Sequence, residues 1–295
     1  MINLPIYSPV EEIFDPLFSS KGVQLFIKRD DMIHPYISGN KWRKLKYILL
    51  EAEKLSKNHL VTFGGAYSNH LLATACAAAK FGFRSTGIVR GEELQNETLL
   101  LCRLFGMQLI FVDRESYLNK PALFVKHFEH DPEAYFIDEG GSGSLATIGC
   151  SELIDELNEV YDHLFCAAGT GTTATGILLG LKKNSVRTKM HIIPVLKGAN
   201  FLKQEIENQT HGASFEFHPD YHFGGYAKTS NELLYFIKDF AASSGILIDP
   251  VYTGKMFYSI YDLINKDHFA KGSKILAVHT GGITGILGMA ERFKF

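Results

Sequence analysis

The segment from Cys166 to Gly176, CAAGTGTTATG, combines glycines and hydroxyls where a short apolar run meets a helical pattern. Glycines let the backbone turn so that successive N–H groups point inward, and the N-terminus of the following helix adds a positive end. Further hydrogen-bond donors around this turn are the hydroxyls of Thr170, Thr172 and Thr173, which flank Gly171. The segment therefore predicts a cradle for a dianionic phosphate.

Two nucleotide-binding patterns do not fit this loop. It contains no lysine, as a Walker A loop would, and its third glycine comes too late for the GxGxxG spacing of a dinucleotide site. A small phosphorylated cofactor suits such a loop better than a nucleotide. The simpler alternative is a tight strand-to-helix turn with threonines as helix caps.

A second segment, GNKWRKLKY from Gly39 to Tyr47, places Lys41 in the first turn of an expected helix. The positive end of a helix disfavours an ammonium group, which would lower the pKa of Lys41 and increase its nucleophilic fraction. Periodicity alone fits a solvated surface lysine equally well. The expected apolar face is Leu45, Ile48 and Leu49, and the residues expected in solvent are Arg43, Lys44 and Lys46.

The segment GGAYSNH, Gly64 to His70, ends a strand in glycines and opens a helix with Ser68 and Asn69. Such an end exposes backbone N–H groups and polar side chains to a carboxylate or a ring oxygen, although Ser68 or Asn69 could simply cap the helix. Three later segments also place glycine and polar residues beside apolar runs, as loops at strand ends do: Gly224–Tyr226, Asp249–Lys255 and His279–Gly282.

Short apolar runs alternate with helical patterns along most of the chain, which predicts parallel βαβ units. The Gly/Ser stretch 139–144 divides them into two series and indicates two lobes, with a ligand between them at the carboxyl ends of the strands. The expected strands are 60–63, 85–89, 108–112, 134–137, 163–168, 191–196, 246–248 and 274–278. The expected helices include 68–81, 93–105, 121–129 and 145–161.

Composition narrows the class of protein. The 295 residues carry a formal net charge of −2 and are 46% hydrophobic, so the basic excess of a general nucleic-acid binder is missing. Neither a signal peptide nor a membrane-spanning apolar run is expected. The four cysteines are widely spaced in apolar or small-residue contexts, which favours reduced, buried thiols over a zinc cluster or disulfides. We therefore expect a cytoplasmic α/β protein without a metal site.

Taken together, these segments resemble the 1-aminocyclopropane-1-carboxylate (ACC) deaminase/D-cysteine desulfhydrase family of pyridoxal-phosphate (PLP) enzymes. The resemblance runs in order through residues 28–31, 39–45, 65–70, 139–142, 169–173, 249–255 and 279–282. It implies the tryptophan-synthase-β-like PLP fold (fold type II), with two open parallel-sheet domains and a cleft between them. The smaller domain is expected at 48–151 and the larger, PLP-binding domain at 1–47 and 152–295. A homodimer is also implied.

The resemblance also implies a role for each candidate residue. Lys41 would carry PLP as a Schiff base and later move protons at the substrate's Cα. The 3′-oxygen of the cofactor would bind Asn69, and residues 170–173 would bind its 5′-phosphate. Ser68 would hold the substrate carboxylate, and the expected substrate-binding set is Ser68, Asn69 and His70. Tyr226 and Tyr252 match the two tyrosines of the family that act as acid/base or leaving-group-assisting residues.

Position 253 bears on the reaction, because ACC deaminases carry a glutamate there to pair with the pyridine nitrogen. Thr253 offers only a neutral hydrogen bond to that nitrogen, so the cofactor ring would be a weaker electron sink. This favours β-elimination of a thiolate, as in the conversion of D-cysteine to pyruvate, ammonia and hydrogen sulfide. The alternatives are an ACC deaminase producing 2-oxobutyrate and ammonia, a non-catalytic PLP or amino-acid binding protein, and a nucleotide-dependent oxidoreductase.

Overall fold

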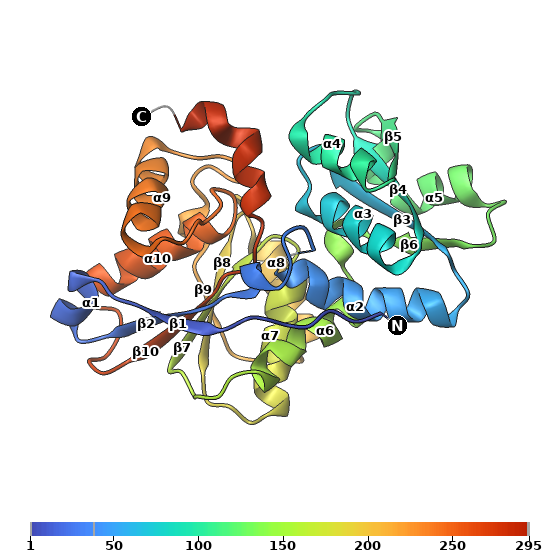
Figure 1. The fold of residues 1–295 in the computed structure, drawn as a ribbon. Helices are drawn as coiled ribbons and strands as arrows, with labels where there is room; N and C mark the ends of the chain where they lie inside the picture. The colour runs from blue at the N-terminus through green and yellow to red at the C-terminus, as the bar shows by residue number, and fades with distance from the viewer. Residues whose placement is uncertain (1, 38, 294–295) are drawn as a thin grey trace.

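The computed structural model describes residues 2–37 and 39–293, which form two β-sheets with helices packed around them (Figure 1). The first sheet has six strands in the order β1-β2-β10-β7-β8-β9, and the second has four in the order β5-β4-β3-β6. Neighbouring strands are parallel except β1 and β2, which are antiparallel. This arrangement is the fold type II architecture that the resemblance implies.

Strands β1 and β2 belong to the six-stranded sheet, β3 to β6 form the four-stranded sheet, and β7 to β10 again belong to the six-stranded sheet. The strands are β1 Val10–Ile13, β2 Gln24–Lys28, β3 His59–Gly65, β4 Arg84–Arg90, β5 Gln108–Val112, β6 Ala134–Ile137, β7 His163–Ala168, β8 Lys189–Pro194, β9 Glu216–Phe217 and β10 Lys274–Val278. The boundary between the domains, at 48–151 against 1–47 and 152–295, stays a prediction.

The α-helices are α1 Pro16–Lys21, α2 Asn40–Lys54, α3 Asn69–Phe81, α4 Glu97–Leu104, α5 Lys120–Phe128, α6 Ser144–Asp155, α7 Thr172–Lys183, α8 Asn200–Gln209, α9 Asn231–Ser244 and α10 Thr253–Asn265. Short 3-10 helices lie at η1 Asp30–Met32, η2 Ser116–Leu118, η3 Glu139–Gly141, η4 Pro219–His222 and η5 Ile283–Arg292. Within the described residues, none of these helices is long and apolar enough to cross a membrane.

Both faces of the large sheet are buried, which explains its near-continuous apolar strands. One face packs against α9 and α10 through side chains such as Ile237 and Phe257, and the other against α6, α7 and α8 through side chains such as Ile177. Helix α2 belongs to the core of the small sheet, where Trp42 and Leu45 are fully buried beside Leu60. The first turn of α2 is thereby held between the two lobes (Figure 1).

Most expected strands are present, but residues 246–248 are not a strand. Ile246 and Ile248 are buried in the core, while the backbone between them bonds to side chains. The N–H of Ile246 donates to Ser244 Oγ, and the carbonyl of Leu247 accepts from His279 Nε2. An apolar run can therefore be a buried loop when side chains replace the sheet ladder.

Two expected helices are shorter than predicted. The helix predicted at 145–161 ends at Asp155, and Glu156 turns inward to bind buried cations. The helix predicted at 93–105 begins only at Glu97, where Asn96 caps it through a 2.8 Å bond from the Leu99 N–H. Strands β1, β2 and β9 were not predicted.

Candidate active site

Lys41 occupies the first turn of α2, after Gly39 at the N-cap position. Gly39 has φ of +62°, and a Cβ there would lie 1.9 Å from the carbonyl oxygen of Thr280, so only glycine fits. Lys41 is partly open to solvent but closely surrounded by protein. This burial, followed by the charge of Lys44, lowers the pKa of Lys41 to about 7. Its amine is therefore a competent nucleophile near neutral pH.

A buried ion network fixes the position of α2. Arg43 donates to both carboxylate oxygens of Asp30, at 2.6 and 2.7 Å, and to both of Glu156, at 2.7 and 2.9 Å. Lys28 also pairs with Glu156, at 2.8 Å. The prediction that Arg43 and Lys44 lie in solvent is wrong, because both are buried and Lys44 donates to the carbonyl of Gly140.

The predicted phosphate loop joins β7 to α7, with Gly171 at the N-cap position and φ of +76°. The first helical bond runs from the Thr175 N–H to the Gly171 carbonyl, so the preceding N–H groups lack an intrahelical partner by helix geometry. Thr172 and Thr173 are buried, whereas Thr170 is exposed and lies with its hydroxyl 3.2 Å from that of Thr172. The loop thus presents amide donors at a positive helix end, as an anion site requires.

Asn40 links Lys41 to this loop. Its amide nitrogen donates to Thr173 Oγ1 at 2.9 Å, and its amide oxygen accepts from Lys41 Nζ at 2.9 Å. Two residues 133 positions apart in the sequence are thereby brought together. Thr173 is the threonine of the loop that binds Asn40.

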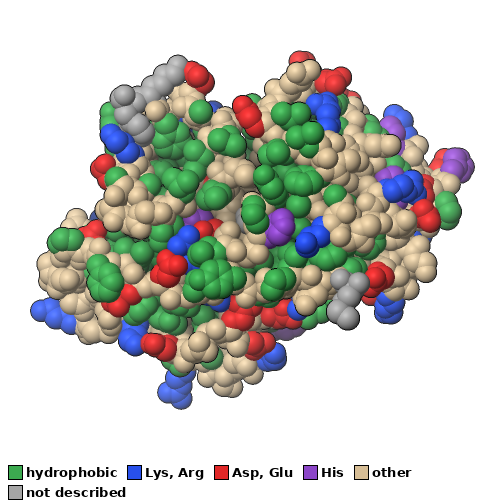
Figure 2. Space-filling model, viewed as in Figure 1, with side chains coloured by type: hydrophobic (Ala, Val, Ile, Leu, Met, Phe, Trp, Pro, Cys, Tyr) green, Lys and Arg blue, Asp and Glu red, His purple; other side chains and the backbone are tan. Residues whose placement is uncertain are grey.

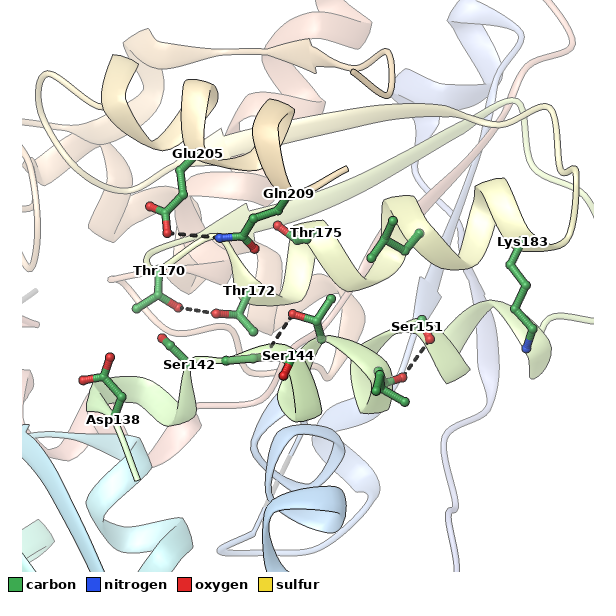
Figure 3. A pocket seen from close by; sticks show the side chains of 14 residues that line it. Asp138, Ser142, Ser144, Ser151, Thr170, Thr172, Thr175, Lys183, Glu205 and Gln209 are labelled. Atoms are coloured by element: carbon green, nitrogen blue, oxygen red, sulfur yellow. Dashed lines mark hydrogen bonds between the residues drawn. The ribbon is translucent and has the colours of Figure 1, made fainter. Parts of the chain in front are cut away.

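Thr170 and Thr172 instead face a groove of about 700 Å³ beside the loop (Figure 3). Asp138 and Ser142 lie at the same end of the groove, and Lys183 lies at the far end. The groove runs along α6, α7 and α8, and Lys41 is not among the residues that line it. Lys41 therefore lies outside this groove.

The N-terminus of α3 supplies Ser68, Asn69 and His70. Ser68 caps the helix, accepting from the N–H groups of His70 and Leu71 at 3.3 and 3.4 Å, and its own proton is left to donate elsewhere. Asn69 reaches the C-terminal segment, donating to the Gly282 carbonyl at 3.4 Å and accepting from Thr284 Oγ1 at 3.1 Å. This part of the site is built from both lobes.

His70 lies beneath the site rather than on its surface. Its Nε2 is 2.8 Å from Thr62 Oγ1, while its Nδ1 is buried without a hydrogen-bond partner in the described structure. Burial and the charges of Lys41 and Lys44 lower the pKa of His70 well below its usual value. The ring is therefore neutral at pH 7.

Tyr226 and Tyr252 converge from two loops. Their hydroxyl oxygens lie 3.5 Å apart, and their rings meet edge to face. Tyr252 also lies against Gly169, where a Cβ would come within 2.9 Å of the tyrosine ring. Burial raises the pKa of Tyr252 well above its usual value, so this hydroxyl stays protonated.

The sequence singled out the segment Asp249–Lys255 but assigned no role to either of its end residues. Lys255 is fully buried and donates to the carbonyls of His222 and Gly225, which fixes the loop that carries Tyr226. Asp249 accepts from the N–H groups of Val251 and Tyr252, each at 2.9 Å. The Asp-Pro pair before a helix was the available signal for Asp249, because acidic side chains often cap helices.

Thr253 is fully buried in the first turn of α10, against the same carboxylate. Its N–H and its hydroxyl donate to Asp249 Oδ1 at 2.8 and 2.7 Å, and its hydroxyl accepts from the Asp249 N–H at 2.9 Å. Asp249 therefore holds Tyr252 and Thr253 together.

These residues fit PLP. A lysine with a lowered pKa stands one side chain away from an anion-binding helix end, and Gly39, Gly169 and Gly171 keep the surrounding backbone free of Cβ atoms that would collide with neighbouring groups. The amine suits an aldehyde, and the helix end suits a phosphate. PLP carries both groups. In the space-filling view the surface is hollowed between the two lobes (Figure 2).

The comparisons define the class of protein. A family model described as pyridoxal-phosphate dependent enzyme matches residues 12–281, so the chain belongs to the PLP-dependent enzymes. The crystal structure of an ACC deaminase homologue superposes with a TM-score of 0.88 at 28% identity, covering 98% of this chain and 94% of that one. The fold of that structure and the cofactor class of the family model both agree with the fold and the site described above.

The relatives narrow the family. A putative ACC deaminase of Pyrococcus horikoshii is 33% identical over 92% of this chain and 88% of its own length. A mitochondrial bifunctional D-cysteine desulfhydrase/ACC deaminase of Arabidopsis thaliana is 32% identical over 92% of this chain and 75% of its own. The chain is a member of the ACC deaminase/D-cysteine desulfhydrase family of PLP-dependent enzymes.

Proposed function

We propose that this enzyme is a PLP-dependent lyase that performs β-elimination on a small amino acid, in the manner of a D-cysteine desulfhydrase. The observation that carries the proposal is the pairing of Thr253 with Asp249. Thr253 has no charge to offer a pyridine nitrogen, and the oxygens of Asp249 already accept four hydrogen bonds. A weaker electron sink suits a substrate whose β-substituent leaves readily, as a thiolate does.

In the proposed reaction, PLP supplies the electron sink for the Cα electrons when it is bound. The neutral amine of Lys41 removes the Cα proton, since a pKa of about 7 leaves much of it unprotonated at neutral pH. Ser68 and the neighbouring N–H groups of α3 hold the substrate carboxylate. We assign Asn69 to the cofactor's 3′-oxygen and the N–H groups of residues 170–173 to its phosphate.

The two tyrosines supply the proton that the leaving thiolate needs. Tyr252 stays protonated, and its hydroxyl can donate to that of Tyr226, 3.5 Å away. Tyr226 is about half exposed and can turn its own proton toward the departing sulfur. His70 is buried, so we assign it a supporting place behind Ser68 and Asn69 rather than a substrate contact.

D-Cysteine and water would give pyruvate, ammonia and hydrogen sulfide. The Cβ–S bond breaks, the sulfur leaves with its thiol proton and takes a second proton, and water supplies the keto oxygen as ammonia is released. The test is to add D-cysteine, L-cysteine, D-serine and ACC in turn to the holoenzyme, while pyruvate, 2-oxobutyrate and sulfide are measured separately. Pyruvate and sulfide in equal amounts from D-cysteine support the proposal. Keto acid from ACC alone would overturn it in favour of an ACC deaminase.

A non-catalytic PLP or amino-acid binding protein is separated by the same experiment. It would show the absorbance of lysine-bound cofactor, lost on borohydride reduction, but no keto acid from any substrate.

We also propose a homodimer in the cytoplasm. All four cysteines are free and buried, which fits a reducing compartment. Light scattering of the purified holoenzyme tests the dimer, and cell fractionation tests the location. A monomeric mass, or recovery outside the cytoplasm, would overturn the corresponding statement.

A further inference from the structure

A cluster of imidazoles lies at the edge of the large sheet. His163 begins β7, His191 lies in β8, Glu216 begins β9, and His218 follows it. His191 pairs with Glu216 across two parallel strands, and the period-two alternation of a strand puts Glu216 and His218 on the same face. His268, from the loop after α10, completes the group. His163, His191 and Glu216 lie in the amino-terminal halves of their strands, away from the loop after β7 that reaches Lys41.

The ligand atoms of three of these residues, His191, Glu216 and His268, all lie within 4.8 Å of one another. His191 Nδ1 lies 3.0 Å from His218 Nε2 and 3.2 Å from Glu216 Oε2. Glu216 Oε2 in turn lies 3.5 Å from His218 Nε2 and 3.1 Å from His268 Nε2. Ligands at about 2.0–2.2 Å from a tetrahedral zinc ion stand about 3.3–3.6 Å from one another. The distances from Glu216 Oε2 to His191 Nδ1 and to His268 Nε2, 3.2 and 3.1 Å, are close to the edges of such a tetrahedron.

We propose a site for a divalent transition-metal cation, best matched by zinc, whose ligands are His191 Nδ1, Glu216 Oε2 and His268 Nε2. Two nitrogens and one carboxylate oxygen form a set that borderline metals take and that calcium and magnesium do not. Three protein ligands leave the fourth position of a tetrahedral zinc ion to water. The proposal departs from the expectation from the sequence that the chain has no metal site.

The surroundings hold the ligands in place. His191 Nε2 lies 2.9 Å from His163 Nδ1, and the His191 ring stacks on Phe165 with centroids 4.3 Å apart. An outer hydrogen bond of this kind fixes the orientation of a metal-bound histidine. Lys189 pairs with Glu216 Oε1, which leaves Oε2 directed at the histidines. His191 is fully buried, whereas Glu216 and His268 are partly exposed and give an ion a route in from solvent.

Ion binding would hold β9 and the loop that carries His268 against β8. β9 has only two residues and lies at the edge of the sheet, and His268 lies in a loop. A four-coordinate ion would fasten both to β8. The proposed effect is therefore on stability, and the elimination chemistry at Lys41 is separate from it.

The experiment is zinc binding to holoenzyme that has been dialysed against a chelator. We expect one zinc per chain by elemental analysis after gel filtration, and a Tm higher by about 3–8 °C with saturating zinc. Cobalt(II) added instead should give the intense visible absorption of four-coordinate cobalt. His268→Ala and Glu216→Gln should each weaken zinc binding at least about 100-fold, and His163→Phe about 10–100-fold through the outer bond.

The matched control is His130→Ala, because His130 is 94% exposed and far along the chain from the cluster. It should bind zinc as the wild type does, and so should Lys41→Ala, which separates this site from the proposed function. His268 lies in a partly exposed loop, so its loss should leave the circular dichroism unchanged. Less than about 0.1 zinc per chain in the wild type, or zinc binding by His268→Ala and Glu216→Gln as tight as that of the wild type, would reduce the cluster to a hydrogen-bonded network and overturn the proposal.

Discussion

Thr253 donates its hydroxyl proton to Asp249 Oδ1 at 2.7 Å and accepts the N–H of Asp249 at 2.9 Å. This reciprocal pair closes the turn that opens α10, and the second carboxylate oxygen holds the N–H groups of Val251 and Tyr252. One buried carboxylate therefore positions both the proposed partner of the pyridine nitrogen and one of the two tyrosines. The Asp-Pro-Val-Tyr-Thr segment acts as a single unit.

Replacing Asp249 by Asn should disturb this unit. An amide group places a donor where the carboxylate accepts, so at least one N–H or O–H donor loses its acceptor in a buried setting. We expect the free energy of unfolding to fall by about 2–5 kcal/mol and the affinity for PLP to fall at least about tenfold. Denaturant unfolding and fluorescence titration with PLP measure the two effects.

The matched control is Asp239→Asn, because Asp239 is exposed on α9. It should change neither quantity by more than about 0.5 kcal/mol. Equal behaviour of the two variants would mean that the carboxylate of Asp249 does not organise the turn. Thr253→Ser, which retains the hydroxyl, should keep more PLP affinity than Thr253→Val.

The sequence predicted those parts of the site that depend on local chemistry. The glycine turn before Lys41 and the glycine-threonine loop before α7 were both found, because positive φ and helix N-termini depend on neighbouring residues. The parallel strands were found from their apolar runs.

The parts that failed depend on distant partners. Arg43 looks like a surface residue on a helical pattern, and it is buried because Asp30 and Glu156, the latter 113 positions away, both pair with it. Residues 246–248 look like a strand, and they form a loop because Ser244 and His279 satisfy the backbone. Single-sequence periodicity carries neither partnership.

Lys41 should control how fast the apoprotein takes up PLP, and its lowered pKa sets the pH dependence. A folded-state pKa of about 7 leaves about one tenth of the amine neutral at pH 6 and nearly all of it neutral above pH 8. The rate of Schiff-base formation should therefore rise with pH and level off near pH 8. Stopped-flow absorbance after mixing with PLP measures this rate, and Lys41→Ala should show no such phase.

Lys44 contributes to that lowered pKa through its charge. Lys44→Met should move the midpoint of the pH profile upward, toward the ordinary lysine value. Lys46→Met is the control, because Lys46 pairs with Glu152 and does not contribute to the pKa of Lys41. A profile that keeps rising up to pH 10 in the wild type would mean that Lys41 is not desolvated.

The two tyrosines should affect turnover more than binding. Tyr252→Phe and Tyr226→Phe each remove a hydroxyl from the proposed proton path, so kcat for D-cysteine should fall about 10²–10⁴-fold while KM changes little. Steady-state sulfide release measures both constants. A substrate with a better leaving group, such as β-chloro-D-alanine, needs less proton donation. Both variants should therefore lose less activity on that substrate than on D-cysteine.

Tyr235→Phe is the control, because Tyr235 is also about half exposed but lies on α9, outside the site. It should retain wild-type kcat. If Tyr226→Phe and Tyr252→Phe lose equal activity on both substrates, the hydroxyls position the substrate and do not protonate the leaving group.

The Arg43 network should be the largest single electrostatic contribution to the position of α2. Arg43→Met leaves the buried carboxylate of Asp30 and the partly buried carboxylate of Glu156 without their main cation, and breaking a buried pair by removing one partner costs about 3–5 kcal/mol. We expect that loss in denaturant unfolding, together with weaker PLP binding, because Lys41 lies two residues earlier on the same turn. Lys46→Met breaks the more exposed pair with Glu152 and should cost only about 0.2–1 kcal/mol. If Arg43→Met is as stable as Lys46→Met, the packing of Trp42 and Leu45 alone holds α2, and Lys41 should then keep its lowered pKa in the variant.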